Sequence, residues 1–189
     1  HRNVVSLLFP DKALFDFHEG DVWTMFHSYC FDFSVWEMYG ALLYGGRLVL
    51  VDTDIVRDTP QFLDLLEREG VTVLNQTPSA FYNLSEADVR RQAQSVRYVI
   101  FGGEALSPVK LQSWKQQYEN CRLINMYGIT ETTVHVTFKE LSLEDLAYST
   151  SNIGRTIPTL YSYVLDSYGQ LLPAGAAGEL YVGGAGVCR

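Results

Sequence analysis

The sequence predicts an α/β fold in which a mostly parallel sheet is flanked by helices, with a small β-rich region near the C-terminus. Helix-like and strand-like stretches alternate over roughly the first 140 of the 189 residues, which is typical of parallel β-α units. Beyond them, short strand-like runs are separated by glycine and proline. We therefore expect residues 1–140 to form the α/β part of one core and residues 141–189 its β-rich part, in a chain cut at both ends.

The first half of the chain is expected to hold three helices, each followed by a strand. The second helix is apolar around most of its circumference, which indicates a buried helix ended by Gly45 and Gly46. The third helix has Pro60 at its first position and ends at Gly70. The helices are expected at 3–17, 34–44 and 59–69, and the strands at 21–26, 47–51 and 71–74.

The second half of the chain is expected to hold one more helix and five strands. The helix begins at Ser107 and Pro108 and runs through Tyr118. A glycine-containing turn at 168–170 separates the last two strands. The strands are expected at 95–101, 121–124, 134–138, 161–165 and 179–182.

The composition indicates an ordered cytoplasmic protein. Apolar residues make up 47% of the chain and charged residues 19%, enough for a sizeable core. The net charge of −8 argues against nucleic acid as a partner, because a phosphate backbone needs a positive footprint. Cys30, Cys121 and Cys188 are far apart and odd in number, so we expect reduced packing residues. No stretch predicts a membrane span or a signal peptide.

The segment 125–133 directly follows a predicted strand and carries groups suited to phosphate chemistry. In an open α/β sheet, ligands bind beyond the carboxyl ends of the strands. Gly128 permits close backbone approach, Thr130 can donate to a phosphate oxygen, and the Glu131 carboxylate suits Mg²⁺. The alternative is a turn followed by a helix cap, in which the threonines only satisfy backbone groups.

The segment 102–108 also joins a strand end to a helix start. Gly102 and Gly103 leave room for a flat ligand, and a helix N-terminus favours an anion. The pattern is neither G-x-G-x-x-G nor a Walker loop, so by itself it is weak support for a binding site.

Asp32 lies between aromatic residues at the start of an apolar helix. Such an aspartate is most often an N-cap or a first-turn acid. The alternative is an anchor for a ligand ammonium group, since a partly desolvated carboxylate favours a cation, with Trp36 as a wall of the same pocket. His135, between two valines, is by itself most typical of a satisfied core histidine, and Asn75 of the end of a strand.

Four short segments, in order along the chain, resemble core motifs of the adenylation domains of nonribosomal peptide synthetases, within the AMP-forming acyl and aminoacyl ligases. They are 1–4, 31–34, 125–131 and 178–184. The resemblance implies ATP-dependent activation of an amino acid as an aminoacyl-AMP, with Mg²⁺. It also implies transfer of the acyl group to the phosphopantetheine thiol of a peptidyl carrier protein domain, beside a condensation domain of the same synthetase.

The resemblance assigns two groups of site residues. For the nucleotide, Thr130 and Glu131 would be catalytic, with Glu131 holding Mg²⁺ and Thr130 contacting the AMP phosphate. Tyr127 would stack on adenine and Asn125 would bond its exocyclic amine, opposite Gly103, Glu104 and Ala105. Asp32 would pair with the substrate ammonium group, and the pocket would be lined by Asp32, Phe33, Trp36, Asn75, Ile100, Gly102, Met126, Val134 and His135.

This set of pocket residues resembles the threonine-selecting pocket of the family. Asn75 and His135 supply hydrogen-bonding groups for a side-chain hydroxyl, while Trp36 and Phe33 restrict the volume. L-Threonine is therefore the expected substrate, ahead of serine or another small hydroxylated amino acid.

Two other functions stay open. One is an acyl- or aryl-CoA synthetase of the same superfamily, which the carboxylate of Asp32 disfavours. The other is a non-catalytic binding remnant, which Thr130 and Glu131 disfavour. The resemblance also implies a phosphate loop before His1, and a ribose-binding aspartate and a catalytic lysine after Arg189, so we expect these 189 residues to be inactive alone.

Overall fold

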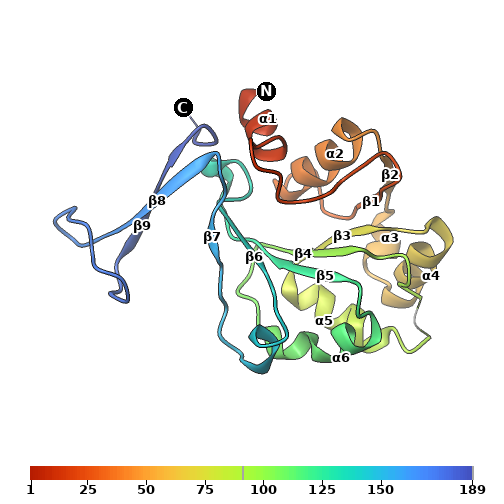
Figure 1. Ribbon diagram of the computed structural model, residues 1–189. Coiled ribbons are helices and arrows are strands. Elements are labelled where there is room, and N and C mark those ends of the chain that lie inside the picture. The colour runs from red at the N-terminus through yellow and green to blue at the C-terminus, as the bar shows by residue number, and fades with distance from the viewer. Residues whose placement is uncertain (91, 189) are drawn as a thin grey trace.

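A seven-stranded sheet forms the centre of the protein, as seen in the computed structural model, which describes residues 1–90 and 92–188 (Figure 1). The strand order is β2-β1-β3-β4-β5-β6-β7, in which the first five strands are parallel and the last two antiparallel. The strands are β1 Val22–Met25, β2 Arg47–Leu50, β3 Val73–Gln76, β4 Tyr98–Phe101, β5 Arg122–Asn125, β6 Thr137–Glu140 and β7 Arg155–Thr156.

Helices cover both faces of this sheet (Figure 1), so the predicted α/β class is confirmed. Helices α1 and α2 pack on one face, and α4, α5 and α6 pack on the other. The α-helices are α1 Arg2–Leu8, α2 Phe33–Leu43, α3 Thr53–Val56, α4 Thr59–Glu69, α5 Pro78–Ala87 and α6 Gln112–Gln117; the 3₁₀ turns are η1 Pro108–Leu111, η2 Thr130–Thr132 and η3 Asp145–Ala147.

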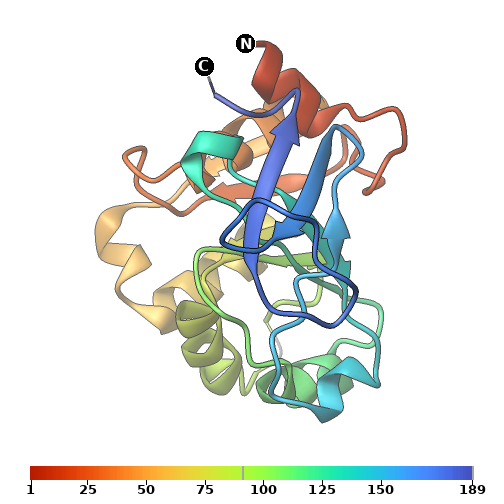
Figure 2. The same ribbon diagram turned by 90° about the vertical axis from the view of Figure 1, so that its left-hand side faces the viewer.

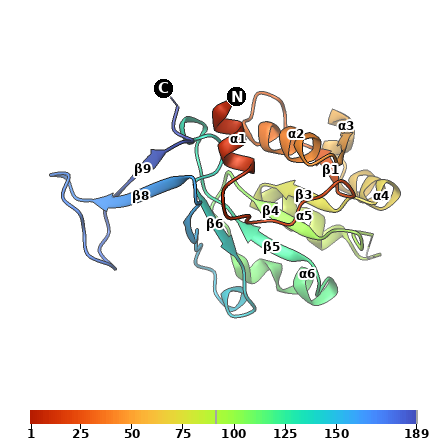
Figure 3. The same cartoon turned by 45° about the horizontal axis from the view of Figure 1, so that its top comes forward.

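Strands β8 (Leu160–Leu165) and β9 (Glu179–Gly184) form a separate two-stranded antiparallel sheet. This sheet projects from the side of the α/β body and faces the viewer in Figure 2. It confirms the predicted β-rich region, at the positions where glycine and proline separate the strand-like runs. The N- and C-terminal ends lie near each other (Figure 3), and the side-chain amide of Asn3 donates to the carbonyl of Gly186 over 3.0 Å.

Helix α4 shows why the local signals worked. The Asp58 side chain caps its start by accepting from the backbone N–H of Gln61. Gly70 ends it in the left-handed conformation, at φ 62°. Its residues Phe62, Leu63, Leu65 and Leu66 are buried against the sheet, as an amphipathic helix requires.

Four expectations about the elements are wrong. The first helix ends at Leu8 rather than residue 17, because Pro10 cannot continue it. Helix α2 buries only one stripe, and Leu42 is 56% exposed. The helix expected from 107 to 118 is divided into η1 and α6. The strand expected at 134–138 begins at Thr137, because Thr133 and Val134 have positive φ, which no strand allows.

Helices α3 and α5 were not expected. Helix α5 follows Thr77 and begins with Pro78, and a proline in the first turn also marks α4. Cys121 is buried, which raises the pKa of its thiol to about 11, but Cys30 and Cys188 are exposed and do not serve as packing residues. The described residues contain no helix whose length and apolar character would let it span a bilayer.

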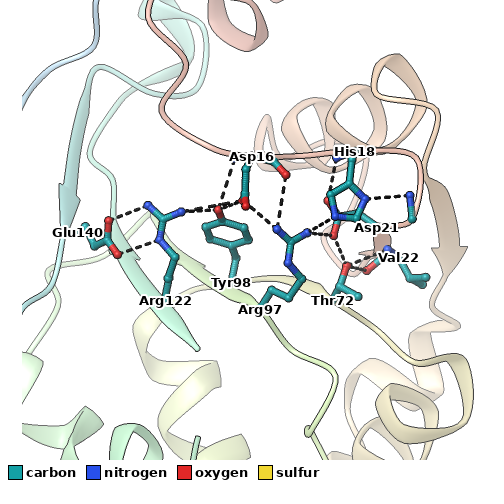
Figure 4. A network of polar contacts seen from close by, with 10 residues as sticks. Asp16, His18, Asp21, Val22, Thr72, Arg97, Tyr98, Arg122 and Glu140 are labelled. Carbon is teal, nitrogen blue, oxygen red and sulfur yellow. Dashed lines mark hydrogen bonds and ion pairs between the residues drawn. The ribbon is translucent and has the colours of Figure 1, made fainter. Parts of the chain in front are cut away.

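A polar network ties together the edge of the sheet at which the parallel strands begin (Figure 4). Arg97 contacts the buried carboxylate of Asp21 at 2.6 Å. Arg122 holds Glu140 through two nitrogen atoms, at 2.7 and 2.8 Å. Between the two arginines, Asp16 accepts from Tyr98 and pairs with Arg97 at 2.8 Å. The segment before β1 is thereby fixed across the starts of β4 and β5.

Candidate active site

The opposite edge, at which the parallel strands end, gathers the residues predicted to bind substrate and nucleotide. The register pairs Asn75 in β3 with Ile100 in β4, and Ile100 with Ile124 in β5. Because side chains alternate between the faces of a sheet, Asn75, Ile100 and the following Gly102 and Met126 lie on one face. That is the face covered by α2, which carries Phe33 and Trp36.

The predicted substrate residues form a buried group beneath α2. The indole N–H of Trp36 donates to Asn75 Oδ1 over 2.9 Å, so the amide of Asn75 has a fixed orientation. Its other end, Nδ2, is buried without a hydrogen-bond partner among the described residues. A buried unpaired donor costs about 1–3 kcal/mol, which a ligand acceptor can recover. The buried members are Phe33, Trp36, Asn75, Ile100, Gly102, Met126, Val134 and His135.

His135 is the second polar group of this buried set, and it is not the satisfied core histidine that its sequence context favours. Neither ring nitrogen has a partner in the described part of the chain. Complete burial lowers the pKa of the imidazole to about 3, so the ring is neutral at pH 7 with one donor and one acceptor. Its ring lies edge-on to Trp36 and Phe33, with centroid distances of 4.9 and 5.3 Å.

Gly102 has no side chain to fill the space between β4 and the rings of Phe33 and His135. A Cβ at this position would lie 3.3 Å from the Phe33 ring and 3.5 Å from the His135 ring. Any larger side chain would therefore occupy the space between β4 and these two rings. Glycine here leaves that space open.

Apart from the buried Asn125, the predicted nucleotide residues form an exposed strip along the same edge. Tyr127, 39% exposed, presents its ring to solvent at the end of β5. Asn125 donates from Nδ2 to the carbonyl of Asn152 over 2.8 Å, which makes Oδ1 the end that can accept from an amine. Across the strip, the Glu104 carboxylate accepts from the backbone and hydroxyl of Ser79 at the start of α5. Gly103 and Ala105 are exposed on either side of Glu104.

The turn that carries Thr130 and Glu131 is held from several sides. The amide of Asn3 in α1 donates to the Thr133 hydroxyl over 3.1 Å, and Cys188 N donates to the Glu131 carbonyl over 2.8 Å. Thr133 and Val134 have φ of 63° and 66°, a costly conformation for β-branched residues. These two residues reverse the direction of the chain. Thr130 and Glu131 before them are exposed, and His135 after them is buried.

Asp32 lies between the buried group beneath α2 and the exposed strip. It occupies the N-cap position of α2, yet its side chain makes no capping hydrogen bond. Its Oδ2 accepts from the Thr130 hydroxyl over 2.8 Å, across 98 residues of sequence. The half-buried Asp32 carboxylate thus faces the turn predicted to contact phosphate.

The carboxylate of Glu131 fits a magnesium ion held together with a nucleotide. The described residues contain no group of three or more histidine, cysteine or acidic side chains that could hold a metal alone. Mg²⁺ at phosphate sites commonly takes one or two carboxylates and completes its shell with phosphate oxygens and water. One exposed carboxylate beside Thr130 suits that arrangement.

Two features of the site were missed from the sequence. Asn3 supports the Thr133 turn from α1; it lies in the segment 1–4 that resembles a family motif, but no role was predicted for its side chain. Glu37 of α2 is fully buried and bonds His27. A signal for Glu37 did exist, because it lies at core spacing with Phe33, Gly40 and Ala41 on the buried stripe.

The fold and this two-part site define a class of protein. Over residues 1–189 the chain matches the family model described as AMP-binding enzyme. The chain belongs to the AMP-binding enzyme family. The resemblance predicted from the four motifs is thereby confirmed.

Its curated relatives are peptide synthetases. The chain is 58% identical over 190 residues to a plipastatin synthase subunit of Bacillus subtilis (strain 168), covering 100% of this chain and 7% of that protein. It is 44% identical over 193 residues to syringomycin synthase SyrB1 of Pseudomonas syringae pv. syringae, covering 100% of this chain and 31% of that protein. The chain therefore spans less than a third of the length of these relatives.

Solved structures share the fold. The structure of holo-PA1221, described as a nonribosomal peptide synthetase protein containing adenylation and PCP domains and bound to a vinylsulfonamide inhibitor, matches with a TM-score of 0.90. That match has 26% identity and covers 99% of this chain and 32% of that chain. The NpsA N-terminal subdomain of Klebsiella oxytoca matches in fold, with a TM-score of 0.85 and 23% identity, over 99% of this chain and 47% of that chain.

Proposed function

We propose that the protein containing this chain activates an amino acid, L-threonine above others, as an aminoacyl-AMP. The observation that carries the proposal is the hydrogen bond from Thr130 to Asp32. It puts a carboxylate suited to an ammonium group beside the turn suited to phosphate and Mg²⁺. An amino acid and ATP bound at these two places would have their reacting groups next to each other.

The residues of this chain act in the first step by holding charge. The substrate carboxylate attacks the α-phosphorus of ATP, the bond to the leaving pyrophosphate breaks, and the aminoacyl-AMP remains. Asp32 pairs with the α-ammonium group, which takes the place of the Thr130 hydroxyl at that carboxylate. The hydroxyl then donates to an α-phosphate oxygen, toward which the substrate carboxylate points. Glu131 would hold Mg²⁺, and the ion would supply positive charge that neutralises the phosphate oxygens. Tyr127 and Asn125 position the adenine.

Threonine matches the hydrogen-bonding groups of the buried set beneath α2. Its hydroxyl can accept from Asn75 Nδ2 and donate to a nitrogen of the neutral His135 ring. Both groups belong to the buried set beneath α2 and lack partners among the described residues. The bond from Trp36 fixes Asn75 with its donor end available. A pocket with such groups disfavours valine, which has the shape of threonine but would leave them unpaired.

The later steps involve parts of the synthetase outside this chain. We propose that the thiol of a phosphopantetheine group on a peptidyl carrier domain attacks the acyl carbon, and AMP leaves. A condensation domain of the same cytoplasmic synthetase would use the loaded amino acid. The matched PA1221 protein contains adenylation and PCP domains together, which supports the carrier domain as a partner. The 189 residues alone are expected to be inactive.

Exchange of labelled pyrophosphate into ATP tests the function on the complete synthetase module. The exchange is measured with each proteinogenic amino acid and with carboxylic acids that lack an α-amine. Strong exchange with threonine supports the proposal. Exchange only with amine-free acids would indicate an acyl- or aryl-CoA synthetase, and no exchange with any acid would indicate a binding remnant.

A further inference from the structure

The loop that carries Asp32 is fastened at both ends by a buried pair, His27 and Glu37. His27 follows β1, and Glu37 lies in α2. His27 Nδ1 lies 2.9 Å from Glu37 Oε1, and the His27 backbone N–H donates to Oε2 over 3.1 Å. Both oxygens of one carboxylate therefore hold the residue at which the loop begins.

The ring of His27 also reaches the far end of the same loop. It stacks on Phe33, the residue that follows Asp32, with a centroid distance of 4.7 Å and an interplanar angle of 19°. Residues 28–32 are thus closed into a short loop, with His27 in contact with the residue after it. Phe31, inside the loop, lies edge-on to the His27 ring at 5.4 Å.

Stability alone does not account for this pair. Glu37 is fully buried, and the His27 side chain is 7% exposed. Burial raises the pKa of the Glu37 carboxyl, and hydrogen bonding to His27 opposes that rise. Replacing a buried ionisable pair with apolar residues of similar volume is often neutral or stabilising. The orientation that the pair imposes is therefore the property to be explained.

Phe33 connects the pair to the substrate pocket. One face of its ring lies against His27, and the ring lies edge-on to His135 at 5.3 Å. His27 Nε2 has no hydrogen-bond partner among the described residues, so Glu37 alone orients the imidazole by hydrogen bonding. A tilt of the His27 ring would move both the Phe33 wall and the loop that holds Asp32.

We propose that His27 and Glu37 are positioning residues that set the affinity for the amino acid without touching it. The pair fixes the Asp32 carboxylate and the Phe33 ring in the arrangement that the ammonium group and side chain require. Apart from the hydrogen bond between Thr130 and Asp32, the nucleotide residues lie on other loops, so we expect the pair to affect ATP binding less than amino-acid binding. The inference rests on the proposed function.

Glu37→Leu in the complete synthetase module tests the inference through a split of kinetic constants. We expect KM for threonine in the exchange assay to rise at least about tenfold, with KM for ATP and kcat changed less than about threefold. Glu37→Gln should stay within about threefold of wild type, because its amide can accept from the His27 backbone and donate to Nδ1. Asp21→Asn, which alters a buried carboxylate at the other edge, should lower the melting temperature and leave both KM values unchanged.

Three results would overturn the inference. The first is an unchanged KM for threonine in folded Glu37→Leu, and the second is an equal rise in both KM values. If Glu37→Leu does not fold, His27→Gln takes its place, because it keeps a donor for Glu37 but loses the stack on Phe33. The third result is an unchanged KM for threonine in His27→Gln. A wild-type module without amino-acid-dependent exchange would instead overturn the proposed function, and this inference with it.

Discussion

The two edges of the central sheet differ in whether their polar side chains have partners. Where the parallel strands begin, Arg97 and Arg122 are paired with carboxylates, and Tyr98 donates to Asp16 (Figure 4). Where the strands end, Asn75 Nδ2 and both nitrogens of His135 are buried without partners in the described residues. The first edge pairs its charged groups with each other, whereas the second leaves these polar atoms available to a ligand.

The difference separates stability from function within one sheet. Buried polar groups are nearly always hydrogen-bonded in folded proteins, so an unpaired group signals a ligand, water or strain. Strain is also present at the second edge alone among the described non-glycine residues, where Thr133 and Val134 have positive φ. At the second edge the unpaired groups and the strained turn lie near the contact between Asp32 and Thr130, which supports the site that the motifs predict.

Asp32→Ala should reduce the exchange activity more than any other variant considered. A small reduction would contradict the division of roles between the two edges. We expect kcat/KM for threonine-dependent exchange to fall at least about 100-fold, because a desolvated ammonium group left without its partner costs about 3 kcal/mol. Asp16→Ala removes a carboxylate from the first edge and should change kcat/KM less than about twofold. Equal losses in both variants would remove the ammonium assignment from Asp32.

His135→Phe should reduce selectivity more than activity. We expect the ratio of kcat/KM for threonine over valine to fall about 30-fold, since the pocket loses a partner for the hydroxyl. Because the pKa of the imidazole is lowered to about 3 and the ring is neutral well below pH 7, the wild-type ratio should stay constant from about pH 6 to 8. A variant that still discriminates as well as wild type would show that His135 is only a wall of the pocket.

Glu131→Gln should change the metal requirement of the exchange reaction. The amide keeps the shape of the side chain but removes its charge, so the Mg²⁺ concentration for half-maximal exchange should rise about tenfold. Glu140→Gln, at the paired edge, provides the matched control and should leave that concentration unchanged. If both variants need the same Mg²⁺ concentration as wild type, Glu131 is not a metal ligand.

The sequence predicted the fold well because its signals are local. Periodicity and glycine ends sufficed for α4, and alternation of elements sufficed for the parallel sheet. The start of β6 was misplaced because nothing local announces positive φ at Thr133 and Val134. Those values depend on contacts with α1 and with the last residues of the chain, such as the bond from Asn3 to Thr133.

Motifs in the sequence were enough to name the residues of the site but not their hydrogen-bond partners. For Asp32 the sequence left a helix cap and an ammonium anchor open, and a contact with Thr130, 98 residues away, distinguishes the side chain from a cap. For His135 the sequence favoured a satisfied core residue, and only the surrounding structure reveals two nitrogens without partners among the described residues. Hydrogen-bond satisfaction is a property of the packed chain.

Arg122→Gln at the paired edge should have the smallest effect, and on stability alone. Arg122 and Glu140 are partly exposed, so we expect a loss of about 1 kcal/mol or less in the free energy of unfolding at pH 7, with unchanged exchange kinetics. The guanidinium of Arg122 holds the pKa of Glu140 below its ordinary value of 4.5.

The stabilisation from this ion pair is therefore complete above pH 4.5. It disappears as the pH falls through the lowered pKa that Glu140 has in the folded protein. Calorimetry of both proteins across this range should show the difference in unfolding free energy shrinking toward zero in acid. A difference that grew in acid, or a changed KM for threonine, would contradict the division between the two edges.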